Sequence, residues 1–190
     1  AGLLRPDEGT IYALDIDVVE QPLSVQSSVG YMPQRFGLYE DLSVQENLDL
    51  YADLQGLPLD KRSSRYADLM HMTGLGPFGR RLAGRLSGGM KQKLGLACTL
   101  VGTPRLLLLD EPTVGMTPDE MMAMIEVVRK AHERFNLAIF LIEHRLKVVH
   151  ELCQHVQALV FGKVLVEGTP NDVQNNPKVI DAYLGEEAVS

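Results

Sequence analysis

The sequence has few cysteines, no long apolar run and no excess of basic residues. Cys98 and Cys153 both fall in apolar patterns typical of helices, so we expect reduced core thiols in a cytosolic protein, with neither disulfide nor metal roles. The longest apolar stretches, such as residues 137–142, are far too short to cross a bilayer, and no signal peptide is recognisable. The net charge of −7 argues against nucleic acid as a partner, because no basic stripe is available to meet phosphates.

The pattern of expected elements indicates an α/β fold. Residues 105–109 and 137–142 are continuous aliphatic runs that predict buried parallel strands, and a helix capped by Thr117-Pro118-Asp119-Glu120 lies between them. A strand is expected at 28–32, a strand or hairpin at 9–19, a hairpin at 156–167, and helices at 43–56 and 60–72. Residues 40–102 are expected to be all helical, and 190 residues suit one domain with a subdomain.

An acidic pair, Asp110-Glu111, ends the first aliphatic strand. Ligands bind at the carboxyl edge of open α/β sheets, so both carboxylates are expected there. Asp110 would hold Mg²⁺ through water, and Glu111 would polarise a water that attacks a γ-phosphate. An ordinary polar strand end explains the pair equally well when it is considered alone.

A second motif, Ser87-Gly88-Gly89, precedes the acidic pair by 23 residues and opens a helix. Ser87 can cap the helix, and the glycines leave the first N–H groups accessible to an anion, which the helix dipole also favours. A capped helix with a flexible lead-in is the alternative.

Gln34 and His144 each follow an expected strand. His144 is placed where it can hydrogen-bond a γ-phosphate and orient water, although a lone histidine is more often structural. Gln34 alone is best read as a solvated loop residue. The order and spacing of Gln34, Ser87-Gly88-Gly89, Asp110-Glu111 and His144 make a chance match improbable.

Together these motifs resemble the nucleotide-binding domain of ATP-binding cassette (ABC) transporter ATP-binding proteins over nearly the whole chain. The resemblance implies a P-loop NTPase (RecA-like) fold with a core of residues 1–39 and 103–170, a helical subdomain of 40–102 and a C-terminal helical tail of 171–190. Residues 30–110 are similar to multidrug-type and ribosome-associated export ATPases. Residues from about Thr117 onward are similar to importer ATPases for branched-chain amino acids, and a composite chain would explain the two likenesses.

The resemblance implies ATP and Mg²⁺ as cofactors. Glu111 and His144 would be catalytic, Asp110 and Gln34 would contact the metal, and Gln34 with Ser87-Gly88-Gly89 would contact the nucleotide. Expected partners are a second nucleotide-binding domain, which meets the first head to tail, and transmembrane permease subunits. The expected place is the cytoplasmic face of the inner (plasma) membrane, as a peripheral subunit.

One family element has no counterpart in residues 1–190, which contain no G-x-x-x-x-G-K-[S/T] phosphate loop. The opening residues resemble the end of the helix that follows this loop, so we expect the loop to lie upstream of Ala1. We also expect the chain to show no appreciable ATPase activity alone. The alternatives are a soluble ABC ATPase acting on ribosomes or DNA, and a non-catalytic module that completes another subunit's site.

Overall fold

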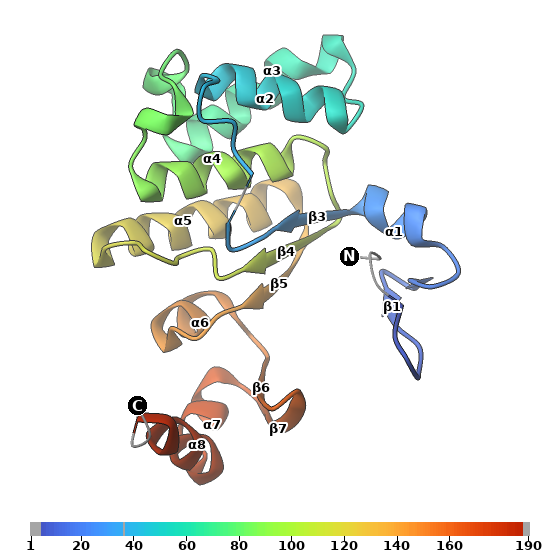
Figure 1. Ribbon diagram of the computed structural model, residues 1–190, viewed down its shortest axis with the longest axis vertical. Helices are drawn as coiled ribbons and strands as arrows, with labels where there is room; N and C mark the ends of the chain where they lie inside the picture. The colour runs from blue at the N-terminus through green and yellow to red at the C-terminus, as the bar shows by residue number, and fades with distance from the viewer. Residues whose placement is uncertain (1–4, 36, 188–190) are drawn as a thin grey trace. The chain divides into compact units, whose positions relative to one another are not determined.

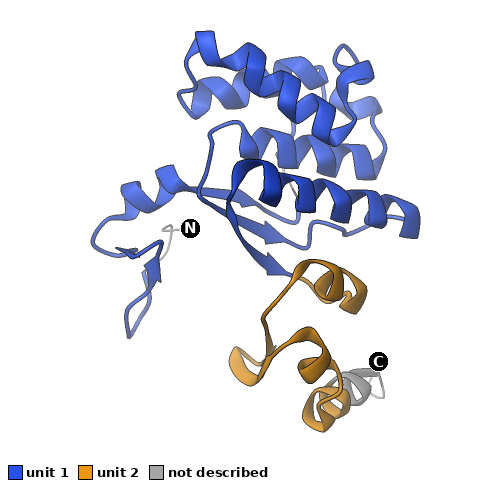
Figure 2. Ribbon diagram, turned by 180° about the vertical axis from the view of Figure 1, so that it is seen from behind, with its two compact units in different colours: residues 1–142 blue, residues 143–190 orange. Residues whose placement is uncertain are grey.

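The computed structural model describes residues 5–35 and 37–187, with side chains up to residue 182. The chain forms two compact units, residues 1–142 and residues 143–190, which Figure 2 colours separately. Each unit is described by itself below. Among the described helices, none is both long and apolar enough to span a lipid bilayer.

A three-stranded parallel sheet organises the first unit. Its strands are β3 (Val29–Met32), β4 (Leu106–Asp110) and β5 (Ala138–Ile142), in the order β3-β4-β5. Helices α2 (Val44–Leu54), α3 (Leu59–Thr73) and α4 (Gly88–Leu100) connect β3 to β4, and α5 (Pro118–Phe135) connects β4 to β5 (Figure 1). Parallel strands require such crossovers, so the expected α/β fold is confirmed.

Only one face of this sheet is buried. Met32, Leu107 and Leu109 are almost fully buried. Helices α4 and α5 lie on one side of the sheet (Figures 1 and 2). On the opposite face, Tyr31 and Phe140 are 41% and 58% exposed. The expectation of fully buried strands at 105–109 and 137–142 was therefore wrong. Continuous aliphatic sequence does not reveal that helices of this unit cover one face only.

Helix α5 (Pro118–Phe135) begins as its sequence signals predict. The Thr117 side chain accepts from the Glu120 N–H, and the Glu120 carboxylate accepts from the Thr117 N–H, which completes a capping box. Backbone hydrogen bonds order the segment between β4 and α5. The Val114 N–H donates to the Glu111 carbonyl, and the Met116 N–H donates to the Thr113 carbonyl. The expected apolar face is confirmed by the buried residues Met121, Met124, Ile125 and Val128.

The segment between β3 and β4 is helical, as expected. It contains α2 (Val44–Leu54), α3 (Leu59–Thr73), two short 3₁₀ turns (Gly76–Phe78 and Ala83–Arg85) and α4 (Gly88–Leu100). The predicted capping box is present at the start of α2, where Ser43 and Glu46 exchange hydrogen bonds. Gly74 ends α3 in the left-handed conformation, with φ 71°, which glycine adopts without strain.

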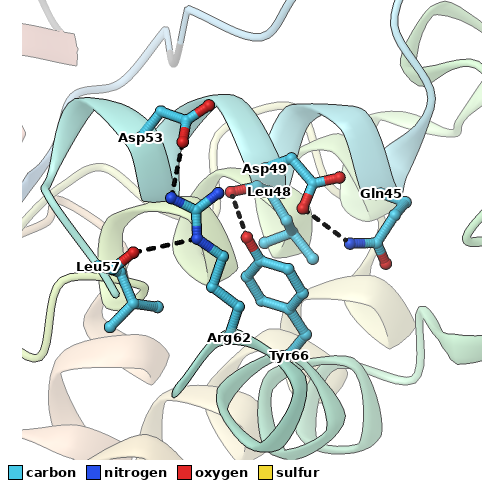
Figure 3. A network of polar contacts seen from close by, with 7 residues as sticks. All are labelled: Gln45, Leu48, Asp49, Asp53, Leu57, Arg62 and Tyr66. Carbon is cyan, nitrogen blue, oxygen red and sulfur yellow. Dashed lines mark hydrogen bonds and ion pairs between the residues drawn. The ribbon is translucent and has the colours of Figure 1, made fainter. Parts of the chain in front are cut away.

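A polar network ties α3 to α2 (Figure 3). Arg62 pairs with Asp53 at 2.6 Å and donates its Nε–H to the Leu57 carbonyl at 3.0 Å. The Tyr66 hydroxyl donates to the Leu48 carbonyl at 3.4 Å, and burial is the main cause that raises the pKa of Tyr66 to about 12. These contacts join α3 to α2 and to the loop between them.

The N-terminal part of the first unit confirms the predicted hairpin, with β1 (Tyr12–Ala13) paired antiparallel to β2 (Ile16–Asp17). Helix α1 (Pro22–Ser28) was not predicted. Its first turn has a proline at N1 but no side-chain cap and no acidic residue, so the local signals for a helix are weak.

The second unit contains α6 (Leu146–Leu152), β6 (Val156–Val160), β7 (Lys163–Gly168), α7 (Pro170–Gln174) and α8 (Pro177–Glu187). The antiparallel β6–β7 pair confirms the predicted hairpin, whose turn residues Phe161 and Gly162 both have positive φ. Cys153 follows α6 in extended conformation and is only half-buried, so its expected place within a helical core was wrong. Cys98 is fully buried in α4, where burial raises its thiol pKa.

Candidate functional site

The acidic pair lies at the carboxyl edge of the sheet. Asp110 is the last residue of β4, and the Glu111 N–H donates to the Ile142 carbonyl at the end of β5, at 2.9 Å. Glu111 has a positive φ of 45°, which is unfavourable for residues other than glycine. Non-glycine residues in this strained conformation often occur at functional sites. The backbone conformation therefore changes at Glu111, directly after the extended residues of β4.

One side chain from β3 and one from the loop after it contact the two carboxylates. The Tyr31 hydroxyl donates to Asp110 Oδ2 at 3.3 Å, and burial followed by the Asp110 charge raises the pKa of Tyr31. The Gln34 amide Nε2 donates to Glu111 Oε2 at 2.6 Å. The structure therefore brings together three of the residues that the sequence predicted, Gln34, Asp110 and Glu111, because parallel β3 and β4 end at the same edge.

The Ser87-Gly88-Gly89 motif forms the N-terminus of the 13-residue helix α4. The Ser87 hydroxyl accepts from the Met90 N–H at 3.2 Å, as a helix cap does, and donates to Glu120 Oε1 at 3.1 Å. A Cβ at Gly89 would lie 2.8 Å from the same Glu120 oxygen, whereas a Cβ at Gly88 would meet open space. Gly89 is thus required by the close approach of Glu120.

Gln92 connects α4 to the edge of the sheet, a contact that the sequence did not predict. Its Nε2 donates to the Gln34 carbonyl at 3.2 Å, while its Oε1 is buried with no hydrogen-bond partner among the described residues. The only signal in the sequence is that Gln92 lies about one helical turn after Gly88, on the helix that the motif opens.

His144 belongs to the second unit, in which a turn precedes α6. The N–H groups of His144 and Arg145 both donate to Glu143 Oε2, at 3.0 and 3.1 Å. The His144 side chain is 58% exposed. Glu143 therefore shapes the turn that presents this imidazole, and the role of His144 at a nucleotide stays a prediction from the sequence.

The oxygen donors at the sheet edge suit Mg²⁺ bound together with phosphate. The carboxylate of Asp110 and the amide oxygen of Gln34 are hard donors, and Mg²⁺ in proteins usually combines one or two carboxylates with water and substrate phosphates. The described residues contain no group of three or more His, Cys, Asp or Glu arranged to hold a metal ion. Asp110 and Gln34 could therefore supply part of the ligands of a Mg²⁺ ion, with water and phosphate oxygens as the others.

Two family models match the chain. A model described as ABC transporter matches residues 1–114. A model described as branched-chain amino acid ATP-binding cassette transporter matches residues 163–189, which agrees with the likeness expected for the C-terminal part.

Among curated proteins, the chain is 45% identical over 170 residues to the probable multidrug ABC transporter ATP-binding protein YbhF of Escherichia coli K12. That match covers 90% of this chain and 29% of the relative. The methionine import ATP-binding protein MetN of Corynebacterium jeikeium is 32% identical over 181 residues, which cover 93% of this chain and 49% of the relative. The chain thus spans about half or less of the length of these relatives.

Solved structures show the same fold. The chain is similar to CbiO1 from Clostridium perfringens, described as part of the ABC transporter complex CbiONQ, with TM-score 0.82 and 24% identity over 96% of this chain and 74% of that chain. An ATP-binding subunit of an ABC transporter gives TM-score 0.75 and 28% identity, and the match covers 99% of this chain and 78% of that chain. The fold is that of an ABC-type P-loop NTPase.

Proposed function

The chain belongs to the ABC transporter family, and from this membership we propose that it binds and hydrolyses ATP to drive transport across a membrane. The observation that carries the proposal is the contact of Gln34 with Glu111, beside Asp110, at the carboxyl edge of a parallel sheet. This edge is where ligands bind in open α/β folds.

Each side chain at this edge has a distinct part in the proposed reaction. Asp110 would hold Mg²⁺ through water, with Gln34 as a second oxygen ligand, and the bound ion would supply charge stabilisation at the phosphates. The Glu111 carboxylate would polarise the attacking water. Gln34 orients that carboxylate through the 2.6 Å hydrogen bond and thus links the position of the loop after β3 to the reacting centre.

The Ser87-Gly88-Gly89 end of α4 would serve a second site, built with the partner domain of a head-to-tail pair. Its capped first turn presents backbone N–H groups and the positive end of a helix dipole to a γ-phosphate. His144 would hydrogen-bond the γ-phosphate and orient the reacting water. We retain residues 1–39 and 103–170 as the proposed core, 40–102 as the helical subdomain and 171–190 as the tail.

Membership of the family also suggests where the protein acts and which proteins it binds. The names of similar proteins include a multidrug transporter and a methionine importer, and one solved relative is part of a transporter complex. We therefore propose that the chain acts at the cytoplasmic face of the plasma membrane, bound to permease subunits through its helical segment. Co-purification with membrane subunits rather than with ribosomes would separate this proposal from that of a soluble ABC ATPase.

Hydrolysis by the complete gene product tests the catalytic assignment. Glu111→Gln keeps the shape of the side chain but removes the base, so we expect Mg²⁺-dependent ATP hydrolysis to fall about 10²- to 10⁴-fold while nucleotide binding persists. Glu126→Gln, on the exposed side of α5, is the matched control and is expected to retain activity. Equal activities in the two variants would refute the role of Glu111.

The capped Ser87-Gly88-Gly89 end of α4 favours a second candidate, a module that completes another subunit's site. A complementation assay distinguishes it. The partner keeps its phosphate loop and carboxylates but carries a substitution at the serine equivalent to Ser87. If residues 1–190 fold as described, adding them is expected to restore hydrolysis, and a Ser87→Arg version is expected not to do so.

A further inference from the structure

The first turn of α4 is already in contact with an anion, the carboxylate of Glu120. Glu120 Oε1 accepts from the Ser87 hydroxyl at 3.1 Å, and Oε2 accepts from the Thr117 N–H at 3.2 Å. A Cβ at Gly89 would lie 2.8 to 3.1 Å from three atoms of the Glu120 side chain. The glycine therefore creates the space that the carboxylate fills.

The charge at this position matches what the helix end favours. The first turn of α4 contains no acidic residue of its own, so Glu120 of α5 supplies the negative charge that the helix dipole stabilises. Hydrogen bonds from the Thr117 backbone, the Ser87 hydroxyl and the Gly89 backbone lower the pKa of Glu120. The carboxylate is thus ionised near neutral pH and lies beside Asp119 and Lys93 in the same hollow.

We propose that Glu120 is an intramolecular occupant of the anion-binding end of α4, which a nucleotide phosphate must displace before it can bind Ser87 and Gly89. The inference rests on the proposed function, because that function places a γ-phosphate at this helix end. A hydroxyl donates one hydrogen, so Ser87 cannot donate to Glu120 and to a phosphate oxygen at the same time. Two anions at this distance also repel each other.

Displacement has a second effect through the other carboxylate oxygen. Glu120 Oε2 caps α5 through Thr117, which ends the turn that follows Asp110 and Glu111. Movement of Glu120 away from Ser87 therefore changes the restraint on this turn. Because Glu120 contacts both Ser87 and Thr117, phosphate binding at α4 competes with the capping box of α5. This competition raises the nucleotide concentration needed to fill the site.

Neutralisation of Glu120 in the complete gene product tests the proposal. Glu120→Gln retains the size and an acceptor oxygen but removes the charge, and Asp119→Asn removes the same charge one residue earlier. For Glu120→Gln we expect the half-saturating ATP concentration for hydrolysis to fall roughly two- to fivefold, the range of a single charge at a helix end. An unchanged or higher value, or an equal fall in Asp119→Asn, would overturn the proposal.

A second measurement keeps the inference separate from the proposed function. Absence of hydrolysis in the unsubstituted protein would refute the function, and titration with inorganic pyrophosphate would then test Glu120 by itself. The backbone amide resonances of Gly88 and Gly89 report binding, and Glu120→Gln is expected to bind pyrophosphate about two- to fivefold more tightly. Glu120→Ser places a short neutral side chain at the same N3 position of α5 and is expected to show the same gain in pyrophosphate affinity. Equal pyrophosphate affinity in all three proteins would overturn the inference.

Discussion

Gln34 donates its side-chain amide to the Glu111 carboxylate at 2.6 Å, although 77 positions separate the two residues in the chain. The contact joins the ends of β3 and β4, and Gln92 of α4 holds the backbone of the same glutamine. The helix that begins with Ser87 is therefore connected to Glu111 through two hydrogen bonds. We therefore expect this connection to couple the proposed nucleotide contacts of α4 to those of the sheet edge.

Loss of the Gln34 side chain is expected to slow catalysis more than it weakens the fold. Gln34→Ala removes one hydrogen bond that orients the Glu111 carboxylate, so we expect hydrolysis at saturating ATP to fall about ten- to a hundredfold. Turnover and thermal unfolding of the complete gene product are measured in parallel, with the exposed Gln154→Ala as control. A loss of activity explained entirely by unfolding would contradict this role.

Gln92→Leu is expected to separate stability from activity. The variant loses the hydrogen bond to the Gln34 carbonyl but also removes a buried oxygen without a partner among the described residues. These effects oppose each other, so the free energy of unfolding should change by less than about 1 kcal/mol. Turnover should nevertheless fall severalfold, since Gln34 loses its restraint. Urea unfolding and hydrolysis assays check both parts, and stability reduced with unchanged turnover would argue against the coupling.

Asn47 is expected to be the most costly polar substitution in the helical segment. It is fully buried, its Nδ2 donates to the carbonyls of Tyr39, Leu42 and Ser43, and its Oδ1 accepts from the Tyr39 N–H. Asn47→Ala removes all four of these side-chain hydrogen bonds and leaves the Tyr39 N–H without its Asn47 acceptor, whereas the three carbonyls keep backbone donors. We expect a loss of about 3 kcal/mol in the free energy of unfolding. Chemical denaturation measures the loss, and Asn175→Ala, at an exposed position, should cost little. A similar cost in both variants would show that the network contributes little.

The capping box of α2 predicts a pH dependence of stability. Hydrogen bonds from the Ser43 side chain and backbone hold the pKa of Glu46 below its usual value of 4.5. The folded pKa is therefore lower than the unfolded one, so the contribution is complete above about pH 4.5 and is lost as pH falls through the folded pKa. Glu46→Gln should lose less stability than the unsubstituted protein when the pH is lowered from about 6 to 3. Unfolding curves across this range are the measurement, Asp60→Asn is the control, and parallel curves for all three proteins would exclude the effect.

Local signals in the sequence predicted several elements because caps and turns act within a few residues. Thr117 and Glu120 marked the start of α5, Ser43 and Glu46 that of α2, and the Gly162 turn was correctly predicted to join two strands. The weakly signalled helix α1 was missed, and the burial of β5 was overestimated. Periodicity reports which residues are apolar but not how many layers cover them.

The sequence by itself determined the family motifs, the α/β order of elements and the residue types available at each strand end. Only the tertiary structure decided that Gln34 meets Glu111, that Gln92 holds Gln34, and that Glu120 contacts Ser87 across 33 positions of the chain. Such contacts depend on the register of parallel strands and on the packing of helices between them. Short-range propensities carry no information about either, because both arise from pairing between segments that are distant in sequence.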